Sequence, residues 1–455
     1  MTSENTSAKI DMLHGGMAKK ILIFSLPLIA SGVLQQSFNA IDVAVVGHFS
    51  SSQALAAVGS NGPIINILIN LFIGISIGAN VVIANYIGRS NREGIRKCIS
   101  TVAVVALLSG LLLCLIGYFF TRPLLEMVNT PPDVIELASL YLRIYFLGMP
   151  FMMIYNFGAA ILRAMGDTKR PFYALVIAGI VNTLLNLFLV IQCGMSVDGV
   201  AIATVTANAI NAAFIFYWLH REQDPYRLRL RHLRIHRAEL VKMLQIGVPA
   251  GLQGMVFSIA NIFIQSVINS YGSAAIAGSA AALNYEVYSY FVISAFVQSA
   301  VAFISQNYGA GKYDRCKRAF RICMLMSVVG CGAMNLLVLW QHEFFLGLFS
   351  QDPAVLHYAM IRVHTVLTIQ FIASSYEISG GALRGLGYSM TPTVLVVFGT
   401  CVLRLIWVYT IGTSCHDFTT LLLIYPISWA VTGIAVLAAY IRVERKVFGE
   451  HLRKV

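Results

Sequence analysis

Acidic and amide side chains inside apolar stretches are the residues of this chain whose types and spacing could support chemistry. Gln35, Asn39 and Asp42 are spaced so that they share one face of a helix. Farther along, Asn182 and Asn186 stand one helical turn apart. A carboxylate at the centre of a membrane costs about 2.5–3.5 kcal/mol on insertion scales, so it usually faces a cavity or a partner.

A third polar stripe follows in the next apolar stretch, where Thr204, Asn208 and Asn211 repeat on one helix face. With Asp42, these residues offer carboxylate, amide and hydroxyl oxygens, which are hard ligands that suit a bare cation or a proton. The alternative is hydrogen bonding between helices, which explains many polar residues in membrane spans. The residues alone leave both interpretations open.

The second half of the chain has polar stripes of its own. They comprise Asn261 and Gln265, then Glu286, Tyr290 and Gln298, and then Gln370, Ser374 and Glu377. Arg404 lies inside another apolar stretch and needs an acidic partner, for which Glu377 and Glu286 are the candidates. We therefore expect a structural ion pair at Arg404, and the alternative for both glutamates is a place in a substrate cavity.

The elements that hold these residues are predicted to be transmembrane helices. Hydrophobic residues make up 58% of the 455 residues and charged residues only 11%, whereas soluble domains carry about 25% charged residues. Apolar runs such as 64–87, 102–120, 173–190 and 421–441 are long enough to cross a bilayer as helices, which takes about 20 residues. They lack the alternating ten-residue pattern of a membrane barrel.

We place twelve spans and orient them by their basic loops. The spans are 21–47, 55–86, 98–120, 134–162, 171–192, 198–219, 241–270, 274–307, 319–340, 355–382, 391–412 and 418–441. Lysine and arginine concentrate before the first span, in the loops after the even-numbered spans and in the central loop. Because positive loops face the cytoplasm, we expect both termini there and a multi-pass protein of the cell inner membrane.

The two halves repeat at an offset of roughly 222 residues. Pro27 matches Pro249, and Asn85-Tyr86 recurs as Asn307-Tyr308. Six spans in each half predict an all-α membrane protein of two pseudo-symmetric six-helix bundles, related as parallel repeats around a central cavity. The predicted organisation is a tail (1–20), an N-lobe (21–220), a basic linker (221–240), a C-lobe (241–441) and a second tail (442–455).

Other classes of protein fit the sequence poorly. The net charge of +12 comes from orienting loops, so it does not indicate nucleic-acid binding. The eight cysteines are scattered without the spacing of a metal site or a disulfide framework. Neither a zincin motif nor a nucleophile elbow is present, so we expect no enzyme and no cofactor beyond a coupling ion. Duplication around a cavity favours a secondary transporter.

Over nearly its whole length the chain resembles the multidrug and toxic compound extrusion (MATE) transporters, within the multidrug/oligosaccharidyl-lipid/polysaccharide flippase superfamily. Five segments carry the resemblance in order: Gln36-Ser-Phe-Asn-Ala-Ile-Asp42, Ser305-Gln-Asn-Tyr-Gly-Ala-Gly-Lys312, Leu383-Arg-Gly-Leu-Gly387, Val402-Leu-Arg-Leu-Ile-Trp407 and Tyr425-Pro-Ile-Ser-Trp429. The resemblance implies an antiporter that exports organic cations against inward flow of Na⁺ or H⁺, and a monomer.

The resemblance also implies an ion-coupling site at Asp42, Asn182, Asn186 and Thr204, which would hold Na⁺ or a proton. Some relatives have a second aspartate at the position of Asn186, and others have an acidic residue in the span that corresponds to 241–270, where this chain has none. The expected substrate cavity, for cationic or amphiphilic small molecules, comprises Gln35, Asn39, Tyr155, Asn208, Asn261, Gln265, Glu286, Tyr290 and Glu377. The alternative function is a flippase for a lipid-linked oligosaccharide or another endogenous amphiphile.

Overall fold

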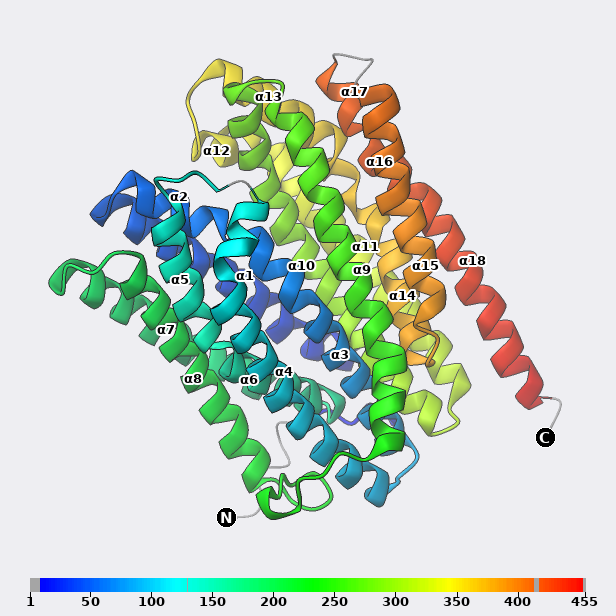
Figure 1. The fold of residues 1–455 in the computed structure, drawn as a ribbon. Helices are drawn as coiled ribbons and strands as arrows, with labels where there is room; N and C mark the ends of the chain where they lie inside the picture. The colour runs from blue at the N-terminus through cyan, green and yellow to red at the C-terminus, as the bar shows by residue number, and fades with distance from the viewer. Residues whose placement is uncertain (1–8, 129, 413–416, 453–455) are drawn as a thin grey trace. The chain divides into compact units, whose positions relative to one another are not determined.

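A computed structural model describes residues 9–128, 130–412 and 417–452 of the chain, and every regular element in these residues is a helix (Figure 1). Eleven helical segments of this described part are long and apolar enough to span a bilayer. Helices α5 (Ile135–Leu147) and α6 (Met149–Ala164) bend by 47° at Gly148 and together make a further span. The prediction of an all-α protein with about twelve spans is confirmed.

The bend between α5 and α6 replaces the single straight span predicted over 134–162. Pro150 occupies the first turn of α6. Because proline has no backbone N–H and its ring crowds the preceding turn, a continuous helix through this point would lose a hydrogen bond. The chain therefore restarts as a second helix, with Gly148 as the joint.

The chain divides into two compact units. Unit 1 runs to Asp11 and continues over Ala30–Gly251, and unit 2 contains Met12–Ile29 and Leu252–Val455. One division lies between Asp11 and Met12, and the other two lie inside helices α1 (Met17–Phe49) and α9 (Arg237–Asn269), two residues after Pro27 and Pro249 respectively. The divisions in α1 and α9 are therefore separated by the same offset, roughly 222 residues, that relates the two sequence repeats.

Unit 1 is built from the later part of α1 and from the helices up to the beginning of α9. Between them come α2 (Ser52–Ser60), α3 (Gly62–Gly88), α4 (Arg92–Met127), α5, α6, α7 (Lys169–Leu187), a π-helical turn η2 (Phe188–Gln192), α8 (Val197–Arg221) and a 3-10 turn η3 (Leu230–His232). Helix α7 packs along α8, and α6 packs against α3, α4 and α8 (Figure 1). This packing brings α7 and α8 together at the candidate site.

Unit 2 repeats the scheme with more interruptions. Its later elements are α10 (Ser273–Gly309), α11 (Tyr313–Trp340), α12 (His342–Gly347), α13 (Pro353–Thr365), η4 (Leu367–Ala373), α14 (Ser374–Gly385), α15 (Met390–Val396), η5 (Val397–Val402), α16 (Leu403–Trp407), η6 (Val408–Gly412), α17 (Phe418–Leu422) and α18 (Ile424–Leu452). Helix α10 packs against α11, α13 and α14, and α14 packs against α18. The turns η5 and η6 are π-helical and flank α16 on both sides.

Helix α4 shows why the surface of unit 1 suits lipid. Leu107, Leu108, Leu111, Leu112 and Leu115 form one stripe of the helix, and each is about half exposed. An apolar stripe of this size on a water-soluble protein would drive association. In a bilayer it faces acyl chains, and the helical backbone satisfies its own hydrogen bonds.

Glycines set the approach of α3 to the beginning of α9 within unit 1. A Cβ on Gly74 would stand 2.1 Å from the backbone nitrogen of Gly251, and a Cβ on Gly78 would stand 2.2 Å from the carbonyl oxygen of Met243. Gly247 and Gly251 present the matching small surface on α9. This pairing of small residues four positions apart lets two helix backbones touch, as in many membrane helix pairs.

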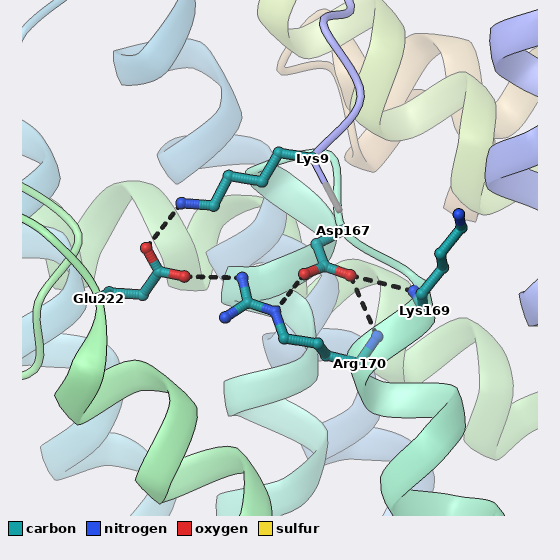
Figure 2. Close-up of polar contacts among 5 residues, drawn as sticks. All are labelled: Lys9, Asp167, Lys169, Arg170 and Glu222. Atoms are coloured by element: carbon teal, nitrogen blue, oxygen red, sulfur yellow. Dashed lines mark hydrogen bonds and ion pairs between the residues drawn. The ribbon is translucent and has the colours of Figure 1, made fainter. Parts of the chain in front are cut away.

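An ionic cluster fastens the beginning of the described chain to unit 1 (Figure 2). Lys9 Nζ lies 2.6 Å from Glu222 Oε2, and Arg170 Nη2 lies 2.7 Å from Glu222 Oε1. Arg170 also donates from Nε to Asp167, whose Oδ1 accepts the backbone N–H groups of Lys169 and Arg170 at 3.0 and 3.1 Å. The segment at Lys9 is thereby tied to the ends of α7 and α8.

Candidate functional site

The candidate site of unit 1 surrounds the carboxylate of Asp42 on α1. This residue is only 8% exposed. Asn182 and Asn186 lie one turn apart on α7 and are both buried, and Thr204 lies on the adjacent α8. Packing of α7 along α8 presents these three side chains to α1, so the four residues that the resemblance implied lie together.

The three neighbours contact the Asp42 carboxylate directly. The Asn186 amide Nδ2 donates to Asp42 Oδ1 at 2.7 Å. The Asn182 Nδ2 donates to Oδ1 at 3.1 Å and approaches Oδ2 at 3.4 Å. The Thr204 hydroxyl lies 3.5 Å from Oδ2, but its nearer acceptor is the backbone oxygen of Val200 at 3.0 Å. The two amides are therefore the principal partners of Asp42.

Two further oxygens at this site have no hydrogen-bond partner among the described residues. The amide oxygens Oδ1 of Asn182 and Asn186 are both buried and both unpaired. A buried polar atom without a partner costs about 1–3 kcal/mol, so such atoms usually mark a place where water or an ion is held. The four side chains carry carboxylate, amide and hydroxyl oxygens, the ligand types that a small hard cation prefers, although the amide nitrogens face Asp42 in this structure.

The other residues expected in unit 1 lie outside this hydrogen-bonded set. Gln35 and Asn39 are exposed on α1, whereas Asp42 is buried. Asn208 is half-buried on α8, one turn beyond Thr204. The Tyr155 hydroxyl donates to the backbone oxygen of Pro171 at 3.4 Å.

The residues expected in unit 2 are dispersed over several helices. Asn261 is exposed on α9, and Gln265 donates to Asn269 at 2.9 Å. The Tyr290 hydroxyl on α10 donates to Glu377 Oε1 on α14 at 3.4 Å, so these two do lie together. A pocket of unit 2 between α15 and α18 contains none of them, since it is lined by Thr391, Val394, Leu395, Ala435, Ala438, Ala439 and Arg442.

The ion pair expected at Arg404 is not found among the residues that the structure describes. Glu286 is buried on α10 and pairs with Arg362 of α13, with Nε to Oε1 at 2.6 Å and Nη2 to Oε2 at 3.0 Å. Arg404 forms no ion pair with any acidic residue that the structure describes. The reason is packing. Helix α13 lies directly against α10, which places Arg362 beside Glu286. Glu286 is thus engaged in a structural pair.

Arg362 is the residue that sequence reasoning missed. It is 2% exposed, its Nη1 donates to the Ser279 hydroxyl at 2.9 Å, and its guanidinium carbon lies 5.4 Å from the ring centroid of Tyr425. It lies just inside the predicted span 355–382. The signal that could have identified it is an arginine inside the apolar residues 353–385, where a buried partner is required.

Comparison with known proteins agrees with the fold and the repeat. The MatE family profile matches residues 27–188 and 249–410, which is once in each half of the chain. The probable multidrug resistance protein YoeA of Bacillus subtilis is 30% identical over 84% of this chain and 84% of its own length. The probable multidrug resistance protein NorM of Thermotoga maritima is 24% identical over 85% and 84%.

Solved structures show the same fold. A MATE crystal structure in the bent conformation superposes with a TM-score of 0.88 over 99% of both chains, at 21% identity. An outward-facing multidrug resistance MATE family transporter superposes with a TM-score of 0.87 over 98% of both chains, at 22% identity. With the family profile matched in both halves, the chain belongs to the MatE family of multi-pass membrane transporters.

Proposed function

We propose that this chain is a cation-coupled antiporter that exports organic cations by alternating access, driven by inward movement of Na⁺ or H⁺. The observation that carries the proposal is the buried Asp42 carboxylate with Asn182, Asn186 and Thr204 around it. An ionisable residue in a membrane span is costly and is generally retained for a function. The names of the relatives, both probable multidrug resistance proteins, support export of drug-like molecules.

The two asparagines give the site a simple way to exchange a ligand. Their Nδ2 groups donate to Asp42 and stabilise its charge. Rotation of either amide about its last bond exchanges nitrogen for oxygen and turns a donor into a ligand for Na⁺. A proton on Asp42 would instead remove the charge that the amides stabilise, so either ion disturbs the same hydrogen bonds.

Coupling follows when the ion and the drug favour different states of the transporter. A ligand shifts a conformational equilibrium only by its difference in affinity between the states, and the effect is reciprocal. Ion binding at Asp42 favours the state that releases drug outside, and drug binding from inside favours release of the ion. Gln35 and Asn39, exposed on the same helix as Asp42, are proposed to contact the drug together with Asn208 and Tyr155.

The proposed setting is the cell inner membrane, with both termini in the cytoplasm. The basic residues near the ends of the spans support this orientation. The ionic cluster of Lys9, Arg170 and Glu222 would then lie at the cytoplasmic surface. We propose a monomer as the working unit, because each chain carries both halves of the repeat.

Ethidium efflux from vesicles that carry the protein tests the proposal, with a Na⁺ gradient and a pH gradient imposed separately. We expect one gradient to drive efflux, and the Asp42→Asn variant to lose it. Efflux that survives in Asp42→Asn contradicts the assignment of the coupling site. No ethidium movement under either gradient, from folded protein, contradicts drug export and favours the flippase for a lipid-linked oligosaccharide.

A further inference from the structure

Arg404 is a buried cation in a membrane span of unit 2, and no acidic residue that the structure describes pairs with it. It lies in α16, a helix of five residues between two π-helical turns, and is 1% exposed. π-helical turns are uncommon and frequently mark functional sites, because the extra residue redirects the side chains around it. An arginine inside a span is itself a candidate functional residue.

The contacts of Arg404 leave one edge of its guanidinium group free. Nε donates to the Ser428 hydroxyl at 3.1 Å. The ring centroids of Tyr425 and Phe257 lie 4.6 and 5.3 Å from the guanidinium carbon. Within the described chain, neither Nη1 nor Nη2 has a hydrogen-bond partner, although both are buried.

Aromatic rings stabilise the charge of Arg404 but do not accept its in-plane N–H groups. A cation–π contact contributes less than is lost when a buried, charged donor has no acceptor. The free Nη edge is planar and presents parallel donors, which is the geometry that binds a carboxylate or a phosphate through two hydrogen bonds. Thr432, one helical turn after Ser428 on α18, adds a buried hydroxyl that also lacks a partner in the described residues.

The repeat places Arg404 at the counterpart of the cation site. The two MatE matches begin at residues 27 and 249, and the same offset relates Asn182 to Arg404 and Asp42 to Ile264. Ile264 is fully buried. Where the first half has a carboxylate and an amide, the second half has a hydrocarbon side chain and an arginine, so the preferred ligand changes from a cation to an anion.

We propose that Arg404 binds an oxyanion, a carboxylate or phosphate group, at this position of unit 2. The anion has two possible sources, a free ion or the acidic group of a transported molecule. The second source rests on the proposed export function, and the first does not. Tyr425 and Phe257 then serve to exclude water from the faces of the guanidinium group, and Ser428 orients it.

Thermal stability of the purified protein tests the oxyanion site without transport. Sodium acetate or sodium phosphate replaces sodium chloride at constant ionic strength, and intrinsic tryptophan fluorescence, to which Trp429 beside Tyr425 contributes, follows unfolding. We expect both oxyanions to raise the melting temperature of the unsubstituted protein, because a ligand of the folded state stabilises it. Arg404→Gln should lose this response, and Arg404→Lys, which keeps the charge without the planar fork, should bind at least about tenfold more weakly.

Arg122→Gln is the matched control, because Arg122 is an exposed arginine of unit 1 and its replacement removes the same charge. It should keep the full oxyanion response. An equal response in Arg404→Gln, or no response in any variant, would overturn the proposal and leave Arg404 with a structural cation–π role. If the Arg404→Gln variant melts at a higher temperature than the unsubstituted protein in chloride alone, this supports an unpaired charge at Arg404.

A matched pair of dyes identifies the source of the anion. Rhodamine 123 is the cationic methyl ester of rhodamine 110, which carries a free carboxylate. If the anion belongs to the substrate, Arg404→Gln lowers rhodamine 110 efflux relative to rhodamine 123 by about tenfold or more. An unchanged dye ratio together with an oxyanion-dependent melting temperature assigns the site to a free anion. Failure of ethidium export in the unsubstituted protein contradicts the proposed function and leaves the stability test valid.

Discussion

The amide of Asn186 on α7 donates to the carboxylate of Asp42 on α1 at 2.7 Å, and this is the shortest contact of the candidate site. The contacts of Asn182 and Thr204 to the same carboxylate follow at 3.1 and 3.5 Å. Hydrogen bonds to a charged group contribute about 1.5–3 kcal/mol each. The distances therefore rank the three neighbours by their expected contribution.

Substitution of these neighbours should weaken ion coupling in the same order. With Na⁺ as the coupling ion, Asn186→Leu removes a side-chain oxygen proposed to bind it, so we expect the Na⁺ concentration for half-maximal drug efflux to rise by about 10–100-fold, with a somewhat smaller rise for Asn182→Leu and one under about tenfold for Thr204→Val. Thr206→Val is the matched control, since Thr206 lies on the same helix and donates to its own backbone at Ile202. Equal effects at all four positions would show that Asp42 is not the centre of the site.

Breaking the Glu286–Arg362 pair should destabilise unit 2. Removing one member of a buried ion pair leaves the other charge uncompensated and costs about 3–5 kcal/mol. We expect Glu286→Leu and Arg362→Met each to lower the melting temperature strongly, and the Glu286→Leu/Arg362→Met double variant to recover much of the loss. A double variant that is as unstable as the two single losses added together would contradict the pair, because independent sites are additive.

The Glu222 cluster predicts how stability depends on pH. Burial of Glu222 raises its pKa, but hydrogen bonds from Lys9 and Arg170 outweigh burial and hold the pKa below the ordinary value of 4.5. A carboxyl group with a lowered pKa in the folded state stabilises the protein at pH values above its unfolded pKa, and this contribution is lost as the pH falls through the folded pKa. We expect Glu222→Gln to melt below the unsubstituted protein at pH 7.

The difference between these two proteins should shrink below about pH 4.5, when Glu222 gains a proton. Glu126→Gln is the control, since Glu126 is exposed and pairs with Arg122 of the same helix, where a salt bridge contributes little. A gap between Glu222→Gln and the unsubstituted protein that stays constant from pH 7 to pH 4 would mean that the cluster does not stabilise the fold through this charge.

Contact between α3 and α9 predicts that added side chains at Gly74 and Gly78 are not tolerated. An alanine Cβ at either position meets backbone atoms that cannot move aside. Overpacking of this kind costs about 1–3 kcal/mol or more. Gly332→Ala on α11 is the control, because a Cβ there has no neighbour within 4 Å. Melting temperatures should fall for Gly74→Ala and Gly78→Ala and stay level or rise for Gly332→Ala, and equal values for all three would contradict the close approach.

Helix positions and the repeat were predictable because they depend on local patterns. Apolar runs of membrane length fix each span, and Pro27 with Pro249 marks equivalent places in the two halves. The α7 residues of the Asp42 site also follow from spacing, since Asn182 and Asn186 share a helix face. Their proximity to Asp42, which lies far away in sequence, came only from the family resemblance.

Pairing between distant residues could not be predicted in the same way. Two arginines inside predicted spans of the second half, Arg362 and Arg404, could each pair with Glu286. The sequence pattern does not say which of them does. The choice depends on how the helices pack, because α13 lies against α10 whereas α16 packs against α18. The bend at Gly148 was missed for a related reason. An apolar run shows that a segment is long enough to span a membrane, but not whether its helix is straight or bent.

Antiport through Asp42 is the central claim, and reciprocal exchange in reconstituted vesicles tests it most directly. An outward ethidium gradient, with no ion gradient imposed, should drive uptake of radioactive Na⁺ or of protons in the opposite direction, and Asp42→Asn should abolish that uptake while the protein still melts cooperatively. Ion uptake of the same size in Asp42→Asn, or ethidium efflux without any ion moving inward, would contradict the account.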